Sequence, residues 1–138
     1  MRSALRSIAA VVAGFVAASI VMMIIETING RVLYPELAKA AEGMTDRDAV
    51  RALMATAPVG AFLVVIAGWI LGGVAGGWVT ARLAARATAG HGLVLGAVLT
   101  LAGIANNLMV PPPLWFWIVS LVVLMPAASA GARLAPAR

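Results

Sequence analysis

The chain has 138 residues, of which 63% are hydrophobic and 11% are charged, and its formal net charge is +5. Soluble domains carry about 25% charged residues, and a chain this short cannot hide so much apolar surface in a water-soluble core. The composition therefore excludes an ordinary soluble domain and predicts an all-α membrane protein. The sequence contains no cysteine, which also excludes disulfides, thiolate metal sites and a redox thiol pair.

Four apolar segments are each long enough to cross a bilayer, whose hydrocarbon core of about 30 Å requires about 20 apolar residues per helix. They cover residues 8–30, 59–83, 92–110 and 114–133. Because backbone groups in lipid must be satisfied within a segment, each is expected to be a helix. We predict a single membrane domain over residues 1–138, built as a four-transmembrane-helix bundle. The first segment is too long for the apolar region of a cleaved signal peptide, so we expect it to remain as a span.

The first span carries a carboxylate near its outer end. Glu26 interrupts the apolar run, and Asn29 follows one turn later on the same face. Charged side chains inside a bilayer are costly and are candidates for functional sites. Two structural interpretations remain open: a polar clamp between helices, or a Glu26 side chain that reaches water and pairs with Arg31.

Residues 35–58 connect the first two spans and are expected to form a short helical outer loop. Pro35 suits the first turn of a short helix that ends near Gly43. Thr45, followed three residues later by Asp48, is typical of a capping box that begins a second helix. This second helix has an apolar side that would lie on the membrane surface or cap the bundle. The loop is either a solvated connector or a docking surface for a partner.

The second and third spans carry glycines at spacings that favour helix packing. They are Gly68, Gly72, Gly76, Gly96 and Gly103. Helices in lipid associate through small residues and polar contacts, because lipid tails remove the hydrophobic drive. We expect these glycines mainly to pack the four spans against one another. The same spacing also occurs where two membrane proteins associate.

The third span ends in two adjacent asparagines that match the depth of Glu26. At 1.5 Å per residue, Glu26 lies about 27 Å above the start of the first span, and Asn107 lies about 22 Å above the start of the third. An amide can donate a hydrogen bond to a carboxylate. We therefore predict a polar intramembrane site of Glu26, Asn29, Asn106 and Asn107. The Glu26 side chain should point into the bundle, within direct or one-water reach of Asn107 or Asn106.

Basic residues gather on one side of the predicted membrane. The N-terminus, the loop from 82 to 91 and the C-terminal tail hold six of them and no acid: Arg2, Arg6, Arg82, Arg86, Arg133 and Arg138. Loops rich in Lys and Arg stay in the cytoplasm, so both termini are expected there and the outer loop in the periplasm. Arginines on one membrane face account for the positive charge without a nucleic-acid partner.

The remaining conspicuous side chains suggest no chemistry. Trp115, Phe116 and Trp117 are expected to form an outer aromatic anchor, with Trp78 as its inner counterpart and Trp69 as a packing residue. His91 is the only histidine, and the sequence shows no metal motif, no nucleophile triad and no phosphate loop. We therefore expect no catalytic residue, no metal and no cofactor.

Three stretches resemble a known group of proteins. They are GGVAGGWVTARLA at 72–84, HGLVLGAVLTLAGIANNLMVPPPLWFW at 91–117, and GARLA at 131–135. These stretches resemble small four-span bacterial inner-membrane proteins of uncharacterised function. The resemblance implies a location in the bacterial inner membrane and a multi-pass topology, and it implies no activity.

Two functions are compatible with these observations. The first is an integral inner-membrane protein without catalysis, which acts as an accessory or interaction subunit. Its partners would be the lipid bilayer and either another membrane protein or a second copy of the chain. The alternative is a small transporter or proton-coupled carrier with a polar site at Glu26 and Asn107.

Overall fold

Helices make up nearly all of the chain in a computed structural model that describes residues 1–84 and 89–136. In chain order they are α1 (Arg2–Ile28), the short π-helical segment η1 (Asn29–Leu33), α2 (Pro35–Ala41), α3 (Arg47–Thr56), α4 (Val59–Leu83), α5 (Ala89–Met109) and α6 (Leu114–Leu134). No strand occurs among the described residues. Four helices are long and apolar enough to cross a membrane, namely α1 continued by η1, α4, α5 and α6. The predicted fold class is therefore confirmed.

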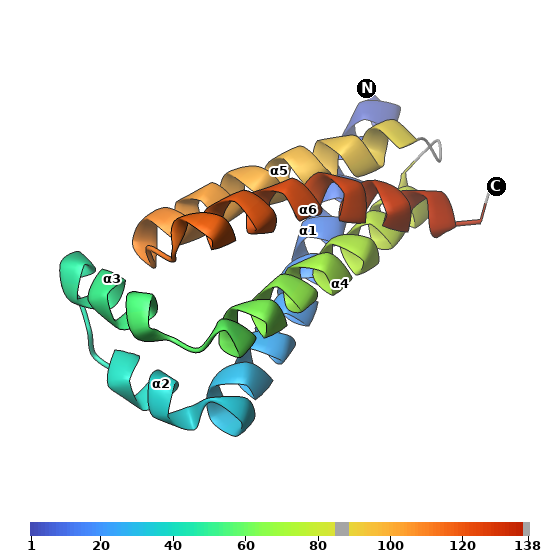
Figure 1. Ribbon diagram of the computed structural model, residues 1–138. Helices are drawn as coiled ribbons and strands as arrows, with labels where there is room; N and C mark the ends of the chain where they lie inside the picture. Colours follow the sequence, from blue (N-terminus) through green and yellow to red (C-terminus); the bar gives the residue numbers. More distant parts are fainter. Residues whose placement is uncertain (85–88, 137–138) are drawn as a thin grey trace.

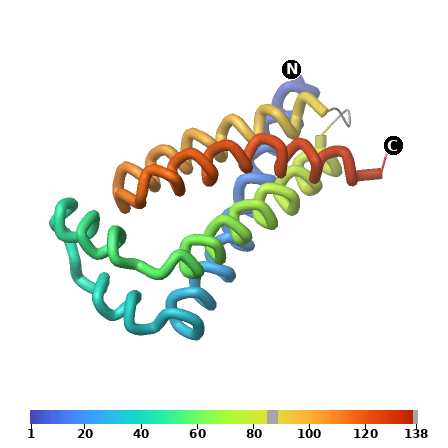
Figure 2. Tube along the Cα trace, viewed as in Figure 1, coloured from blue at the N-terminus to red at the C-terminus, as the bar shows by residue number. Residues whose placement is uncertain are grey.

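The four long helices pack in the order α1, α4, α6, α5 (Figures 1 and 2). The contacts between α1 and α4, between α4 and α6, and between α5 and α6 are extensive, whereas α1 touches α5 only slightly. The bundle is thus loosely closed along the line between α1 and α5. Both chain termini lie at one end of the bundle, and α2 and α3 lie at the other (Figure 1).

Helix α4 is central because its glycines face two different neighbours. Gly68, Gly72 and Gly76 face α1, and Gly73 and Gly77 face α6. A Cβ atom on Gly76 would lie 2.6 Å from the backbone oxygen of Gly14 in α1. A Cβ atom on Gly73 would lie 2.9 Å from the Cβ of Ala127 in α6. The absence of side chains at these positions lets the backbones approach closely, as expected for packing in lipid.

The glycines of α5 face the inside of the bundle too. A Cβ atom on Gly96 would lie 2.9 Å from the Cα of Met125 in α6. A Cβ atom on Gly103 would lie 3.1 Å from Cζ3 of Trp69 and 3.2 Å from Cδ1 of Leu124. Gly103 therefore leaves the room that the Trp69 ring occupies.

The aromatic cluster at the start of α6 differs from the predicted anchor. Phe116 is only 3% exposed, and its ring centroid lies 5.2 Å from that of Phe62 and 5.9 Å from that of Trp69. Successive helical residues point about 100° apart, so three consecutive aromatics cannot share one face. Trp115 is 36% exposed and remains at the surface, whereas Phe116 belongs to the core.

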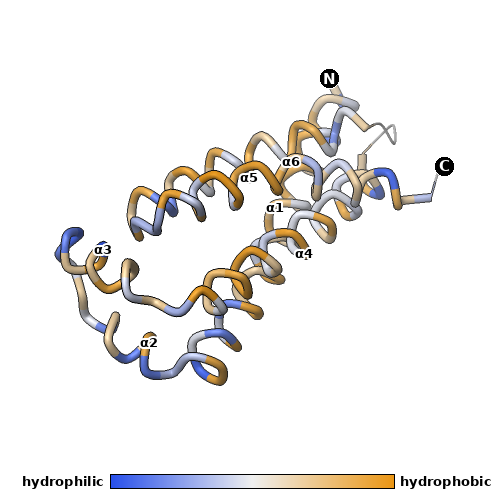
Figure 3. Tube along the Cα trace, in the orientation of Figure 1, coloured by the Kyte–Doolittle hydropathy of each residue, from blue (hydrophilic) through white to orange (hydrophobic). Residues whose placement is uncertain are grey.

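Helices α2 and α3 form an outer arm, which we define as residues 35–56 (Figure 1). Figure 3 shows hydrophilic residues along this arm and at the end that carries the termini, with apolar residues between them. The helix α3 begins one residue later than predicted, because Asp46 rather than Thr45 is its N-cap and accepts a hydrogen bond from the Ala49 amide at 3.0 Å. A charged acceptor binds the first-turn amides more strongly than a hydroxyl does.

Candidate functional site

The first span does not end in an ordinary helix terminus. After Ile28 it continues as the π-helical segment η1, and Asn29 is the first residue of that segment. Asn29 is buried, and its Nδ2 donates a hydrogen bond to the Ala61 carbonyl at 3.0 Å. This bond ties the outer end of α1 to the first turn of α4. Single π-helical turns inside longer helices are frequent at functional sites.

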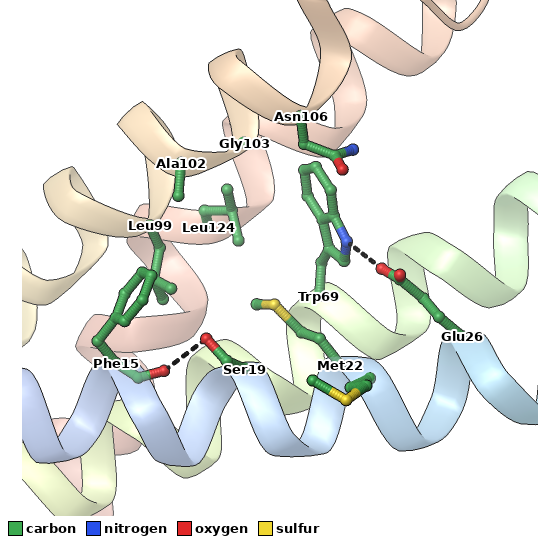
Figure 4. A pocket seen from close by; sticks show the side chains of 11 residues that line it. Phe15, Ser19, Met22, Glu26, Trp69, Leu99, Ala102, Gly103, Asn106 and Leu124 are labelled. Carbon is green, nitrogen blue, oxygen red and sulfur yellow. Dashed lines mark hydrogen bonds between the residues drawn. The ribbon is translucent and has the colours of Figure 1, made fainter. Parts of the chain in front are cut away.

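Glu26 lies one turn before this segment and binds Trp69. Its Oε1 accepts a hydrogen bond from the indole Nε1 of Trp69 at 3.0 Å (Figure 4). Trp69 comes from α4 and is 4% exposed, whereas Glu26 is exposed. Trp69 was expected to be a packing residue only, and its hydrogen bond to Glu26 was not predicted. One feature could have indicated it: a buried indole N–H requires an acceptor.

Asn107 turns away from Glu26 and binds α6. It is completely buried, and its Nδ2 donates to the Ser120 hydroxyl at 3.2 Å. The Ser120 hydroxyl in turn donates to the Trp117 carbonyl at 3.4 Å. Within the described residues, no hydrogen bond joins Glu26 to Asn106 or Asn107. Since α5 packs mainly on α6, the buried face of α5 at Asn107 is the one that faces Ser120.

Two buried amide oxygens are left without a protein partner. They are Oδ1 of Asn29 and Oδ1 of Asn107. The partners fix both amide orientations: the Ala61 carbonyl can only accept, and the Ser120 hydroxyl already donates to Trp117, so each contact requires the amide nitrogen. A buried acceptor without a partner costs about 1–3 kcal/mol.

Two cavities lie beside Glu26. The inner cavity has a volume of about 260 Å³ and lies between α1 and α5, with Trp69 and Leu124 also in its wall (Figure 4). The outer cavity has a volume of about 350 Å³ and extends to the outer arm, where Met54 lines it. Glu26 and Asn106 line both cavities, and we call the place where these two residues lie the junction of the cavities.

The structure brings all four predicted polar residues to the outer cavity, which is lined by Glu26, Asn29, Asn106 and Asn107 among others. No Lys, Arg or His among the described residues lines either cavity. The ion pairs between described residues are Lys39–Glu36 at 3.4 Å and Arg51–Asp48 at 3.7 Å, and both lie on the exposed arm. The Glu26 carboxylate thus has no cationic partner in the described part of the chain. That part also contains no group of three His, Cys, Asp or Glu side chains that could hold a metal ion.

Together these features define an all-α protein with four candidate membrane-spanning helices and a polar pocket near one end of the bundle. Comparisons with protein families, with curated proteins and with solved structures each find no match for the chain. Its function must therefore be argued from its own geometry.

Proposed function

We propose that this is a non-catalytic integral protein of the bacterial inner membrane that acts as an accessory or interaction subunit. The observation that carries this proposal is the outer arm. Helices α2 and α3 fold outside the four-helix bundle, and α3 has its own N-cap at Asp46. A segment that only connects two membrane spans does not need two helices of its own.

The arm has an inner apolar side and an outer charged side. Met54 of α3 and the following Ala57 pack against the cluster of Phe62, Ile66 and Phe116 at the outer end of the bundle. The charged side of α3 carries Arg47, Asp48 and Arg51, all of them exposed. The arm is therefore held in place by its apolar side, and its charged side is available to a partner.

The proposed orientation places both termini in the cytoplasm and the arm in the periplasm. Arginines cluster at the terminal end of the bundle, where Arg6 Nε donates to the Leu83 carbonyl at 3.0 Å and Arg82 lies 5.4 Å from the Trp78 ring centroid. Arg86 and Arg138, which the positive-inside argument also uses, lie outside the described residues. In the sequence, six basic residues fall in the N-terminal, 82–91 and C-terminal segments and four in the first loop, and this excess supports a cytoplasmic location for the terminal end.

Site-specific crosslinking tests the proposed interaction. Because the chain contains no cysteine, Arg47→Cys or Arg51→Cys introduces a single thiol on the charged side of the arm. We expect a crosslinker on this thiol to capture one protein in stoichiometric amount in native membranes. Val12→Cys, on the apolar surface of α1, is the matched control and should capture none. Failure of both arm positions to give a stoichiometric adduct would contradict the proposal.

A small carrier is the second candidate, and the junction of two cavities at Glu26 favours it. A carrier needs a polar group within the span that a substrate or a proton can reach, and Glu26 lines both cavities. Purified protein in liposomes should then show a proton flux that Glu26→Gln abolishes, because an amide cannot titrate. An equal flux with Glu26→Gln, or no flux above empty liposomes, would rule this candidate out.

A further inference from the structure

We infer that the two cavities form one binding site for an amphiphilic ammonium compound, with Glu26 and Asn106 at its polar centre. The ligand class is a molecule with a protonated amine and an apolar body. This inference concerns binding alone and goes beyond both proposed functions, since an accessory subunit and a carrier could each hold such a ligand.

The carboxylate of Glu26 makes the site suitable for a cationic ligand. Among the described residues that line the two cavities, only Glu26 carries a formal charge. Its Oε1 is bound by Trp69, which is a neutral donor, and its Oε2 remains for another partner. An ammonium group would give Oε2 a charged partner, which no described basic side chain supplies within ion-pair distance.

The polar groups around Glu26 include amide oxygens that can accept hydrogen bonds. Asn106 is exposed and stands at the cavity junction, so its amide oxygen is available as well. Asn29 and Asn107 line the outer cavity, and each is more than nine-tenths buried with an unpaired Oδ1. Both oxygens are covered by neighbouring atoms, so the accessible acceptors of the site are Oε2 of Glu26 and the amide oxygen of Asn106. An ammonium group carries positive charge and N–H donors in one compact head.

The cavity walls fit an apolar body attached to that head. Phe15, Met22, Leu99 and Leu124 line the inner cavity, and Phe62 and Phe116 line the outer one. Aromatic faces also attract cations. Because α1 and α5 touch only slightly, the inner cavity lies along the least tightly packed line of the bundle, where a molecule dissolved in the bilayer can arrive.

No described basic residue lines either cavity, and this favours some ammonium compounds over others. A phospholipid head group with an ammonium also carries a phosphate, which would lie near Glu26 without a cation to pair it. An alkyl carboxylate would meet the same repulsion. A free amphiphilic amine therefore fits the site better than a zwitterionic lipid does.

Fluorescence of Trp69 provides a direct assay of binding. Trp78, Trp115 and Trp117 are replaced by Phe, so that Trp69 is the only indole and reports on its hydrogen bond to Glu26. The protein is placed in phosphatidylcholine nanodiscs and titrated with decylammonium, with decanol and decanoate as probes of equal chain length. We expect a saturable spectral change with decylammonium alone.

Two variants and one control test the role assigned to Glu26. Glu26→Gln should weaken decylammonium binding by about tenfold or more, since it replaces a charged acceptor by a neutral one. The amide oxygen can still accept from Trp69, so the emission without ligand should be nearly unchanged. Ala102→Phe, which fills the inner cavity and keeps Glu26, should also abolish the response. Glu36→Gln on the arm is the matched control and should bind as the parent does.

Several results would overturn the inference. These are the absence of a saturable response to decylammonium, an equal response to decanol, and unchanged affinity in both Glu26→Gln and Ala102→Phe. A titration in nanodiscs containing phosphatidylethanolamine distinguishes the sources of the ammonium. If that lipid suppresses decylammonium binding beyond dilution, the site binds lipid head groups and the assignment to free amines is wrong.

Discussion

The indole Nε1 of Trp69 donates a hydrogen bond to the carboxylate Oε1 of Glu26 at 3.0 Å, and this bond joins α4 to α1 within the predicted membrane. The Trp69 ring also lies 5.9 Å from the ring of Phe116, in a T-shaped arrangement. Trp69 thus connects the polar pocket to the apolar core. Gly103 of α5 leaves the room that the ring requires.

Two replacements of Glu26 should distinguish the stability that its hydrogen bond to Trp69 provides from the effect of its charge. Glu26→Leu leaves the Trp69 N–H without an acceptor and should reduce the free energy of unfolding by about 0.6–2 kcal/mol, as for polar contacts in other membrane helices. Glu26→Gln retains an acceptor and should cost less. Unfolding in mixed micelles measures both. In the Trp69→Phe background the two replacements should differ little, and a persistent difference would mean that Glu26 is stabilised by another group.

Because α1 packs closely on α4, adding one methyl group at their interface should reduce the free energy of unfolding. Gly76→Ala places a Cβ atom 2.6 Å from the Gly14 carbonyl oxygen, which belongs to the backbone and cannot rotate away. Overpacking of this kind costs about 1–3 kcal/mol. Gly30→Ala is the matched control, because its Cβ atom would meet its nearest neighbour, Ala38, at an ordinary 3.5 Å. Equal unfolding free energies for the two variants would contradict the observed packing of α1 on α4.

Asn107 should contribute little to stability despite its complete burial. Asn107→Leu removes an unpaired oxygen, and Ser120 keeps its bond to the Trp117 carbonyl. Removing a polar group that is only partly satisfied can be nearly neutral, so we expect a change within about 0.5 kcal/mol. Asn107→Asp should instead cost about 2 kcal/mol or more, because it adds a charge inside the bundle. A similar large loss in both variants would show that Asn107 has a stabilising partner.

Thiol labelling in intact cells tests the proposed orientation. A single cysteine at Met44, which lies in the outer arm, should react with a membrane-impermeant maleimide added outside the inner membrane. A single cysteine at Ser3, near the N-terminus, should react only after the membrane is opened. The reverse pattern would place both termini in the periplasm.

The long helices could be predicted because composition and segment length decide them. The second span was expected at residues 59–83, and α4 runs from Val59 to Leu83. The π-helical segment η1 was not expected, since a change from i→i−4 to i→i−5 bonding has no residue signature. The cap of α3 was misplaced by one residue because Thr45 and Asp46 are both good N-cap residues.

For the candidate site, the sequence predicts the depth of each residue along its helix. It does not predict the direction in which the side chain points. The rise per residue places Glu26 and Asn107 at similar depth, and both line the outer cavity. Depth does not determine which neighbour a side chain faces. Because α5 packs on α6, Asn107 binds Ser120, and Asn106 takes the place beside Glu26 at the cavity junction. Trp69 was missed because its position in the second span does not show that its indole faces Glu26 of α1.

Carboxyl labelling in the membrane tests most directly whether Glu26 stands at the junction of the two cavities. Dicyclohexylcarbodiimide is apolar and reaches carboxyl groups through the bilayer, and peptide mapping separates Glu26 from the four acids of the arm: Glu36, Glu42, Asp46 and Asp48. We predict that Glu26 is modified in the parent protein and that Ala102→Phe, which fills the inner cavity, slows its modification strongly. Equal rates in the two proteins would mean that Glu26 is reached from the lipid surface rather than through the cavity, and would contradict its place in the pocket.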